Sequence, residues 1–424
     1  MRSVIVIGGG AAGMMAAGTA ARAGAQVLLL EKNRLLGKKL LITGKGRCNL
    51  TNACEIEEVI ARFGAQGKFL YSSLHRFPPM ATQSFFVERG LELVVERGQR
   101  VFPASGRSSD VVKALADYVR ESGAAVRLNS PVMEILTDRG ANGEGMANKP
   151  LERRITGVKL SDHTIIEADR VILATGGASY PGTGSTGDGY VMAGRLGHTI
   201  DPLLPALVPL RVKEEWVKTA SGLSLRNVQA SLFHGEKLIG KEFGEMLITH
   251  FGVSGPIILT LSRLVPPLTN SGSTLRLEID LKPALDDERL DARLQRDFQR
   301  YARKAIKNAL SDLLPKALIP IVIAESMIEP ECPVHQITKE ERHRLLRVLK
   351  GLPLTVLGTL PLAAAIVTAG GVMLDEVDPR TMASRLVDGL FFGGEVLDLA
   401  ANTGGFNLQA AFATGHVAGL NAAS

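Results

Sequence analysis

Apolar runs that end in glycine or an acid mark the start of the chain. Residues 4–7 form an uninterrupted apolar run that leads into the glycines and alanines of residues 8–13, and Gln26–Leu30 is a second run that ends at Glu31. Such runs, separated by small residues, predict two buried parallel strands joined by a helix that begins at Gly13. We therefore expect a βαβ unit at the start of an α/β fold.

The next part of the chain contains further strands. Residues 110–122 predict a helix, and residues 125–128 and 171–173 predict strands. Three alternating segments, residues 132–137, 155–160 and 164–167, predict a β-meander, in which we expect residues 140–149 to form a mobile hairpin tip. From about 201 to 281, short strands with proline and glycine predict an inserted β-rich domain.

A helical period replaces this pattern over residues 286–314. Its predicted buried face consists of Leu290, Leu294, Phe298, Tyr301, Ala305 and Ala309. A basic stripe is expected along one side of the same helix, at Arg289, Arg293, Arg296, Arg300, Arg303 and Lys307. The stripe is either a solvated face or, in a chain of net charge +6, a ridge that contacts RNA phosphates.

Composition indicates a folded protein of two or three domains, since the chain has 424 residues, of which 45% are hydrophobic and 22% charged. Residues 351–374 carry no charge, but prolines and glycines interrupt them, so we expect buried strands and turns and no membrane span. Cys48, Cys54 and Cys332 form no C-x-x-C pair, which argues against a redox disulfide or a metal site. We expect a cytoplasmic protein, because the chain opens in its first strand without a secretory signal.

The glycines after the first strand predict a dinucleotide site. Gly8 allows the tight turn, Gly10 lets backbone amides approach a pyrophosphate, and Gly13 lets the helix pack on the strand. Glu31 is placed to accept hydrogen bonds from ribose hydroxyls, which favours FAD or NAD. A second G-x-G-x-x-G, at Gly182, Gly184 and Gly187, follows no strand and is not interpreted as a second fingerprint.

Two later segments add to this prediction. The strand at 171–173 ends in the small residues Ala174, Thr175 and Gly176, where a nucleotide can come close. Further along the chain, Asp188 lies at the start of a predicted helix. It either caps that helix, or the first amides of the helix face the flavin site. Gly394 and Glu395 end another strand, and a helix follows to about Leu420. Glu395 is suited to a ribityl hydroxyl, and the first amides of that helix to negative charge on a reduced flavin.

These segments and several others resemble one family. They are residues 8–13, Leu36-Gly37-Lys38-Lys39, residues 43–52 (Thr-Gly-Lys-Gly-Arg-Cys-Asn-Leu-Thr-Asn), residues 174–177, residues 250–256, residues 368–372 and the closing segment. The chain resembles, nearly end to end, the BaiN-like or aminoacetone oxidase family of FAD-dependent oxidoreductases.

The resemblance implies a glutathione-reductase-like FAD-binding Rossmann domain in two segments, residues 1–197 and 364–424. It also implies an insert that caps the flavin, with a β-barrel over residues 198–285 and 325–363 and a helical part over 286–324. Carried over by role, the cofactor residues are Gly8, Gly10, Ala12 and Gly13 at the pyrophosphate, Glu31 at the ribose, Arg47, Cys48 and Asn49 near the flavin, Val132 at the adenine, and Glu395, Asn407, Leu408 and Gln409 at the ribityl chain and ring. The cofactor-binding residues that we expect without a separate role are Ala11, Lys32, Lys38, Gly46, Ala174, Thr175, Gly176 and Gly394.

Three groups of residues in these motifs keep two interpretations each. Lys38, Lys39, Lys45 and Arg47 either bind an anionic substrate or balance the FAD phosphates. Cys48 is either a small buried residue or a reactive thiol, and no partner cysteine lies at a redox spacing. His250 is our candidate catalytic proton donor, with a structural role as the alternative.

Three function classes follow. The first is a small-molecule oxidoreductase in which NAD(P)H reduces the flavin and the flavin passes hydride to an electron-poor carbon. The second is an RNA-modifying flavoenzyme that reduces a ribosomal uridine to dihydrouridine, with structured RNA as partner. The third is a flavin-binding scaffold or sensor without turnover. The sequence gives no oligomeric state.

Overall fold

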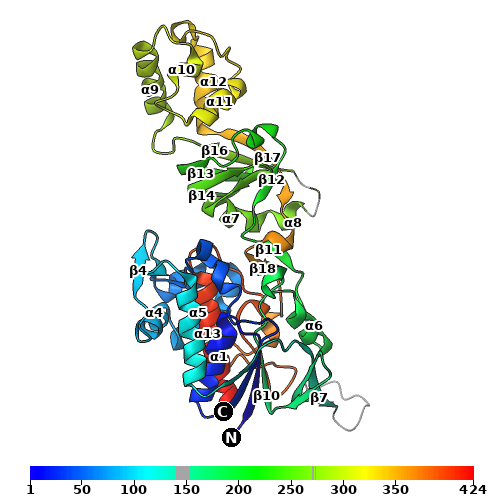
Figure 1. Cartoon of the computed structure of the whole chain (residues 1–424). Helices are drawn as coiled ribbons and strands as arrows, with labels where there is room; N and C mark the ends of the chain where they lie inside the picture. The colour runs from blue at the N-terminus through cyan, green and yellow to red at the C-terminus, as the bar shows by residue number, and fades with distance from the viewer. Residues whose placement is uncertain (140–152, 270–271, 273) are drawn as a thin grey trace. The chain divides into compact units, whose positions relative to one another are not determined.

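Two units, each with its own hydrophobic core, make up the chain (Figure 1). The computed structural model describes residues 1–139, 153–269, 272 and 274–424, so the predicted hairpin tip at 140–149 lies outside the described residues. The first unit contains residues 1–204 and 362–424, and the second contains residues 205–361. The sequence places these boundaries at 197/198 and 363/364, within about seven residues of the observed ones.

A parallel sheet of five strands forms the centre of the first unit, in the order β19-β10-β1-β2-β6. The strands are β1 Ser3–Ile7, β2 Gln26–Leu30, β6 Ala125–Arg127, β10 Arg170–Leu173 and β19 Leu390–Phe392. Ile7 of β1 lies opposite Leu30 of β2 and Leu173 of β10, so the three strands end level with one another. Because β19 comes from the C-terminal segment, both ends of the chain build one sheet, and the predicted α/β fold is confirmed.

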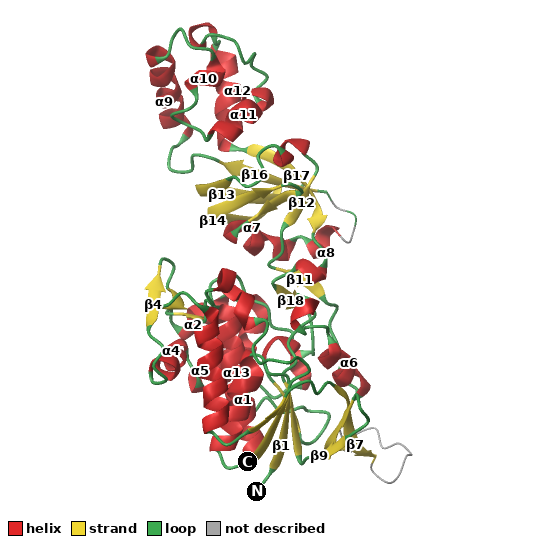
Figure 2. Ribbon diagram, in the orientation of Figure 1, coloured by secondary structure: helices red, strands yellow, loops and turns green. Residues whose placement is uncertain are grey.

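Three long helices of the first unit lie side by side (Figures 1 and 2): α1 Ala11–Arg22, α5 Ser108–Glu121 and α13 Phe406–Ala423. The last of these runs three residues beyond the predicted end at Leu420. Gly415 lets α13 approach α1 closely, because a Cβ there would lie 2.4 Å from the carbonyl oxygen of Ala12. Helix α13 is thereby fixed against the helix that follows the glycine loop.

Two small antiparallel sheets and short helices complete the first unit. The sheets are β3 Thr51–Asn52 with β5 Arg100–Pro103 and β4 Leu93–Glu96, and the predicted meander β7 Val132–Arg139, β8 Arg153–Leu160 and β9 Ile165–Glu167. The other elements are α2 Ile56–Ala61, α3 Tyr71–Arg76, α4 Pro79–Val87, α6 Asp188–Arg195, β11 Leu204–Ala206, which spans the boundary between the units, and β18 Val367–Ala369.

A closed barrel of six strands forms one half of the second unit, in the order β12-β15-β14-β13-β16-β17. Its strands are β12 Leu210–Val212, β13 Ser224–His234, β14 Lys237–Thr249, β15 Gly252–Ser254, β16 Leu275–Asp280 and β17 Leu352–Thr359, with helices α7 Pro256–Leu261 and α8 Pro266–Thr269 beside them. Ala230, Leu232, Leu277 and Ile279 alternate with polar neighbours along two paired strands and are buried in the core of this unit.

Four helices form the other half: α9 Asp287–Arg300, α10 Ile306–Ala309, α11 Ile319–Glu325 and α12 Lys339–Lys350. The prediction of one continuous helix over 286–314 is wrong, because α9 ends at Arg300 and a turn follows in which the amide of Lys304 donates to the carbonyl of Tyr301. Arg303 and Lys307 consequently do not continue the stripe of α9.

A second prediction about this half is also wrong. The sequence analysis places residues 339–350 in the barrel, but they form helix α12. A capping box between Thr338 and Glu341 stabilises the start of this helix, and its buried face consists of Leu345, Leu346 and Leu349.

Residues 351–374 form β17, β18 and turns, as predicted for this uncharged stretch. Within the described part of the chain, no helix combines the length and the apolar character that crossing a membrane requires.

Candidate cofactor site

Three predicted cofactor segments meet at the carboxyl edge of the sheet. A Cβ added to Gly8, after β1, would lie 2.5 Å from the carbonyl oxygen of Ala174, after β10. A Cβ added to Gly394, after β19, would lie 2.8 Å from the Cβ of Ala12. This edge is where open α/β sheets bind their ligands, so the structure brings the segments together at the expected place.

The glycines of the loop differ in what surrounds them. Gly8 has φ +105°, and a Cβ on Gly13 would lie 1.8 Å from the carbonyl oxygen of Gly8, so the protein itself requires both glycines. At Gly10 the added Cβ would meet nothing within 4 Å. Gly10 also precedes α1 without a side-chain cap, so the first amides of α1 face space in which a pyrophosphate fits.

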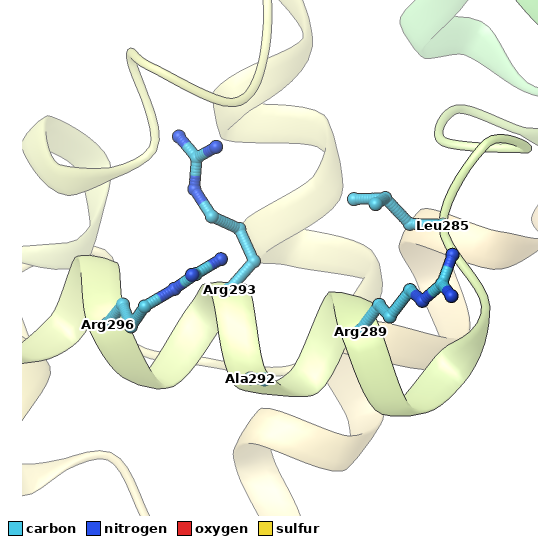
Figure 3. Close-up of a pocket in the computed structure, with 5 residues that line it drawn as sticks. All are labelled: Leu285, Arg289, Ala292, Arg293 and Arg296. Carbon is cyan, nitrogen blue, oxygen red and sulfur yellow. The ribbon is translucent and has the colours of Figure 1, made fainter.

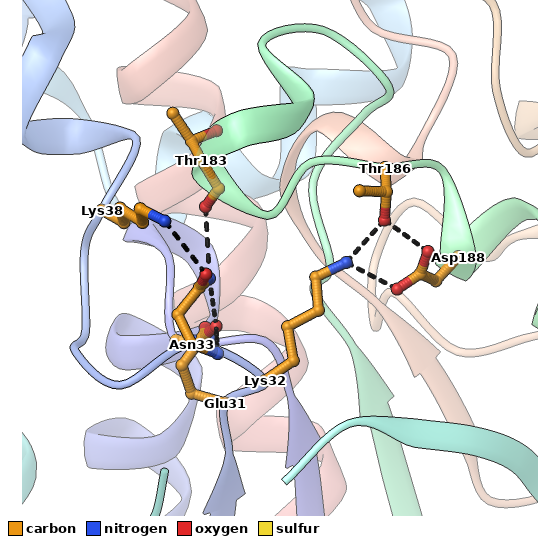
Figure 4. Close-up of polar contacts among 8 residues, drawn as sticks. Glu31, Lys32, Asn33, Lys38, Thr183, Thr186 and Asp188 are labelled. Carbon is orange, nitrogen blue, oxygen red and sulfur yellow. Dashed lines mark hydrogen bonds and ion pairs between the residues drawn. The ribbon is translucent and has the colours of Figure 1, made fainter. Parts of the chain in front are cut away.

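Glu31 is held firmly at the end of β2 (Figure 4). Its side chain is buried, with Oε2 accepting from the amide of Gly9 at 2.7 Å. The other oxygen, Oε1, accepts from the backbone amide of Asn33 at 2.8 Å and from its side-chain amide at 2.7 Å. The carboxylate is thus fixed between the glycine loop and the residues after β2, and its contact with a ribose stays a prediction.

Lys32 and Asn33 tie a distant loop to this edge (Figure 4). The Lys32 ammonium lies 2.6 Å from Oδ2 of Asp188 and 2.5 Å from the hydroxyl of Thr186, and the side-chain amide of Asn33 donates to the carbonyl of Thr183 at 3.2 Å. Burial raises the pKa of Asp188, but the hydrogen bonds from Lys32 and Thr186 outweigh it and leave that pKa below its usual value.

The structure therefore corrects one interpretation of Asp188. Helix α6 has no side-chain cap, so Asp188 serves as the partner of Lys32 and not as the cap of its own helix.

Val132 begins β7 directly after a segment that runs along the same edge. The amide of Ser130 donates to the carbonyl of Glu31 at 2.9 Å, and the amide of Asn129 donates to the carbonyl of Asn33 at 3.0 Å. The Val132 side chain is buried in the core of the first unit. Its predicted place beside the adenine stays a prediction.

The basic residues of segments 36–39 and 43–52, the flavin motif, are mostly paired within the protein. Lys39 contacts Glu395 at 2.9 Å, and Arg47 forms an ion pair with Glu96 and lies 4.2 Å over the ring of Phe102. Among the residues that the structure describes, Lys38 reaches only the amide oxygen of Asn33, at 3.5 Å. The predicted cluster of free positive charge is thus reduced to the exposed Lys38 and to Lys45.

Cys48 fits its structural interpretation. The residue is fully buried in the core of the first unit, and this burial raises the pKa of its thiol to about 11 despite a hydrogen bond with Thr43. A thiol of this kind is protonated near neutral pH and is a poor nucleophile. It lies between Arg47 and Asn49, and Gly46 adopts φ +82° just before them.

Side chains at the start of α13 are already engaged. Glu395 accepts from Lys39 and from the amide of Thr368 at 2.9 Å. Asn407 holds the backbone of Ala401, and the buried amide of Gln409 bonds Thr51, Thr82 and Phe77. Asn407 and Gln409 therefore shape the site, while the first amides of α13, which Leu408 shares, stay available because Gly405 brings no side-chain cap.

Two buried polar atoms at this edge have no partner among the described residues. They are the hydroxyl oxygen of Thr175, after β10, and the side-chain oxygen of Asn49, in the flavin motif. Because unpartnered buried polar atoms are costly, they favour a ligand that would satisfy them. Together with the space at Gly10 and the uncapped helices, they show that the residues present fit FAD.

The sequence analysis missed Asn33, Thr183 and Thr186, which complete the network around Glu31 and Lys32. Thr183 and Thr186 lie about 150 positions away along the chain, so no local pattern could have indicated them. Asn33 could have been noticed only through its place two residues after Glu31.

His250 belongs to the second unit. It is exposed in the turn after β14, and its ring meets the ring of Phe251 edge-on at 4.9 Å. The hydroxyl of the neighbouring Thr249 is buried and has no partner in the described parts of the chain. The indole nitrogen of Trp216 is also buried without a partner there. The sequence analysis did not predict these two polar atoms; Thr249 ends β14, and Trp216 lies in the 3₁₀ turn Glu215–Lys218.

The fold and the site define a Rossmann-type flavoprotein with an inserted barrel. The family model for the HI0933-like protein Rossmann domain matches residues 2–421, and the chain belongs to this family of FAD-dependent oxidoreductases. The resemblance that the motifs indicated is thereby confirmed.

Two relatives match over almost their whole length. The chain is 34% identical to the 3-dehydro-bile acid delta(4,6)-reductase of Clostridium scindens, covering 100% of this chain and 99% of the relative. It is 30% identical to the ribosomal RNA dihydrouridine synthase of Haemophilus influenzae, covering 98% and 97%. Among solved structures, the 3-ketosteroid delta1-dehydrogenase of Sterolibacterium denitrificans is similar in fold, with a TM-score of 0.54, 14% identity and full coverage of both chains.

Proposed function

We propose that the protein is a reductase that uses FAD to saturate an electron-poor carbon–carbon double bond, with NAD(P)H as the source of electrons. The observation that carries the proposal is the joint edge of β1, β10 and β19, with the open space at Gly10 and the unpartnered Thr175 hydroxyl. The relatives support the choice of reaction, since one is named for reducing a bile acid and the other for making dihydrouridine, which is uridine with its C5=C6 bond reduced.

The residues of the first unit would each do a separate part of the binding. Glu31 would accept hydrogen bonds from the ribose, the amides of α1 would face the pyrophosphate, and the amides of α13 would face the oxygen-rich edge of the flavin ring. When bound, FAD supplies two-electron hydride transfer. The chain's own task is then to orient the substrate and to provide the proton that accompanies the hydride.

His250 is our candidate for that proton. Imidazole is the side chain that most often serves as a general acid, and the ring of His250 is exposed in the turn after β14. Replacing His250 by Gln should lower kcat while leaving FAD binding unchanged. His234→Gln, at the exposed β13–β14 turn, is the matched control. Unchanged turnover in His250→Gln would remove it from the mechanism.

Reduced nicotinamide would bind without a Rossmann unit of its own. The second glycine pattern falls in a 3₁₀ turn at Pro181–Thr183 and the loop after it, and does not connect a strand to a helix. Transient binding, with the nicotinamide leaving before the substrate enters, fits a single dinucleotide site.

Structured RNA is the second candidate substrate. The specific observation in its favour is a pocket on α9 that three arginines line. Mass spectrometry of ribosomal and transfer RNA nucleosides from cells lacking the gene tests it, because an RNA reductase predicts the loss of a dihydrouridine.

A single-turnover experiment tests the reaction itself. The FAD-loaded protein is reduced without oxygen and mixed with a conjugated steroid enone or with unmodified ribosomal RNA. Reoxidation of the flavin, with two hydrogens gained by one of these substrates, would support the reductase and identify its class. A flavin that stays reduced with both would contradict the proposal for these classes and favour a non-catalytic flavin-binding role.

A further inference from the structure

A pocket in the helical half of the second unit carries a charge pattern that the proposed hydride transfer does not use. It has a volume of about 300 Å³ and is lined by Leu285, Arg289, Ala292, Arg293 and Arg296 (Figure 3). Three of the five lining residues are arginines, and none is an acid.

The basic lining results from how α9 distributes its charges. Residues 287–300 contain four acids and four arginines and so carry no net charge. Leu290, Leu294 and Phe298 face the core of the second unit, and Asp291 is bound to Arg342 of α12 at 2.7 Å. The local excess of positive charge at the pocket is therefore built by the fold and not by the composition of the helix.

The arginines keep hydrogen-bond donors free. Arg293 contacts Asp297 through Nε at 2.7 Å, and Arg289 contacts Asp286 through Nε at 3.4 Å. No other acceptor in the described ranges reaches their terminal nitrogens, and Arg296 has none at all there. The ion pair with the nearly buried Asp297 fixes the Arg293 side chain, while its terminal N–H groups remain for a ligand.

A neighbouring lysine reports the same positive potential. Burial lowers the pKa of Lys282, and the charge of Arg293 lowers it further. The nearby carboxylate of Asp280 does not neutralise the positive charge of Lys282 and Arg293, because it forms an ion pair with Lys350 at 2.6 Å. An anion placed among the arginines would relieve this repulsion.

We propose that this pocket binds a phosphate group, carried either by a polynucleotide backbone or by a smaller phosphorylated molecule. Guanidinium groups match the oxygens of a phosphate with two parallel hydrogen bonds each. Leu285 and Ala292 add an apolar wall for the sugar or carbon atoms next to the phosphate. The proposal does not depend on the FAD chemistry, since it involves only residues of the second unit, but its polynucleotide form deepens the RNA candidate of the proposed function.

Binding of two probes to the FAD-loaded protein tests the pocket. The probes are pyrophosphate, followed by calorimetry, and a short fluorescent single-stranded RNA, followed by anisotropy. The variant Arg293→Gln/Arg296→Gln removes two lining charges. The control Arg300→Gln removes an exposed arginine of the same helix that pairs with Asp312 and does not line the pocket.

We expect the double variant to weaken at least one probe by about tenfold or more, and Arg300→Gln to weaken it by less than about twofold. Loss of pyrophosphate binding alone would identify a small phosphorylated ligand. Loss of RNA binding, with the slope of log affinity against log salt reduced by about 0.7 per lost contact, would identify a polynucleotide.

Equal loss in the control, or no loss in the double variant, would overturn the proposal. The thermal midpoint and the flavin spectrum of each variant verify that it folds and keeps its cofactor. Flavin reduction by NAD(P)H should be unchanged in all of them, so failure of the pocket and failure of the reductase proposal can be told apart.

Discussion

Lys32 and Asp188 form an ion pair of 2.6 Å across 156 positions of sequence (Figure 4). The pair joins the end of β2, where Glu31 is fixed, to the first residue of α6. Both side chains are partly shielded from solvent, with 27% and 41% of their surfaces exposed. The loop before α6 is thereby held next to the end of β2.

Replacing Lys32 by Met should weaken FAD binding without unfolding the protein. The substitution removes the ion pair and the contact with Thr186 but keeps the length of the side chain. We expect about a fivefold rise in the Kd of FAD, which corresponds to about 1 kcal/mol. A fluorescence titration of the apoprotein with FAD measures it.

Lys113→Met is the matched control, because it removes the exposed ion pair with Asp117 on α5. If both substitutions change the Kd of FAD equally, the Lys32 pair has no special relation to the cofactor.

Alanine substitution should mainly lower stability at Gly13 and mainly lower FAD affinity at Gly10. In Gly13→Ala the new methyl group would lie 1.8 Å from a carbonyl oxygen, so the free energy of unfolding of the apoprotein should fall by about 2 kcal/mol or more. In Gly10→Ala the methyl group enters open space at an extended backbone, so stability should change by less than about 1 kcal/mol.

The affinity for FAD should nevertheless fall by about tenfold or more in Gly10→Ala, because the methyl group occupies the approach of the pyrophosphate. Thermal unfolding and FAD titration of both variants measure the two effects. Unchanged FAD affinity in Gly10→Ala would place the pyrophosphate elsewhere.

Local pattern was sufficient for the loop and the sheet. Short apolar runs and glycine spacing fixed the positions of β1, β2 and β10, and the small residues after them identified the edge where ligands bind. The glycine roles also followed from spacing, because the steric reason for Gly8 and Gly13 is the same in every tight βα turn.

Long-range contacts and helix ends were beyond that pattern. The apolar period continued through Tyr301 and Ala305, so nothing local signalled that α9 stops at Arg300. The sequence predicts that the side chain of Gln409 contacts the cofactor. In the structure this side chain forms hydrogen bonds with Thr51 and Thr82, which lie more than 320 positions away. Such pairings depend on the tertiary fold, which a single sequence does not display.

Thr175→Val should stabilise the apoprotein and weaken FAD binding. The Thr175 hydroxyl is buried without a partner within the described residues, and an unsatisfied group of this kind costs about 1 to 3 kcal/mol. An isosteric methyl group removes that cost, so the apoprotein should gain about 1 kcal/mol. If the hydroxyl bonds FAD, the Kd of FAD should rise about fivefold. An unchanged Kd would mean that the hydroxyl faces no polar atom of the cofactor.

Cys48 should resist alkylation at pH 8 in the folded protein. Its thiol is fully buried and has a pKa of about 11, so the reactive thiolate is both rare and inaccessible until the pH approaches that value. Cys332 is partly exposed and should react first, although burial raises its pKa as well. Mass spectrometry after iodoacetamide treatment, with and without denaturant, measures both sites. Rapid labelling of Cys48 in the native protein, or loss of turnover in Cys48→Ala with FAD still bound, would instead assign this thiol a chemical role.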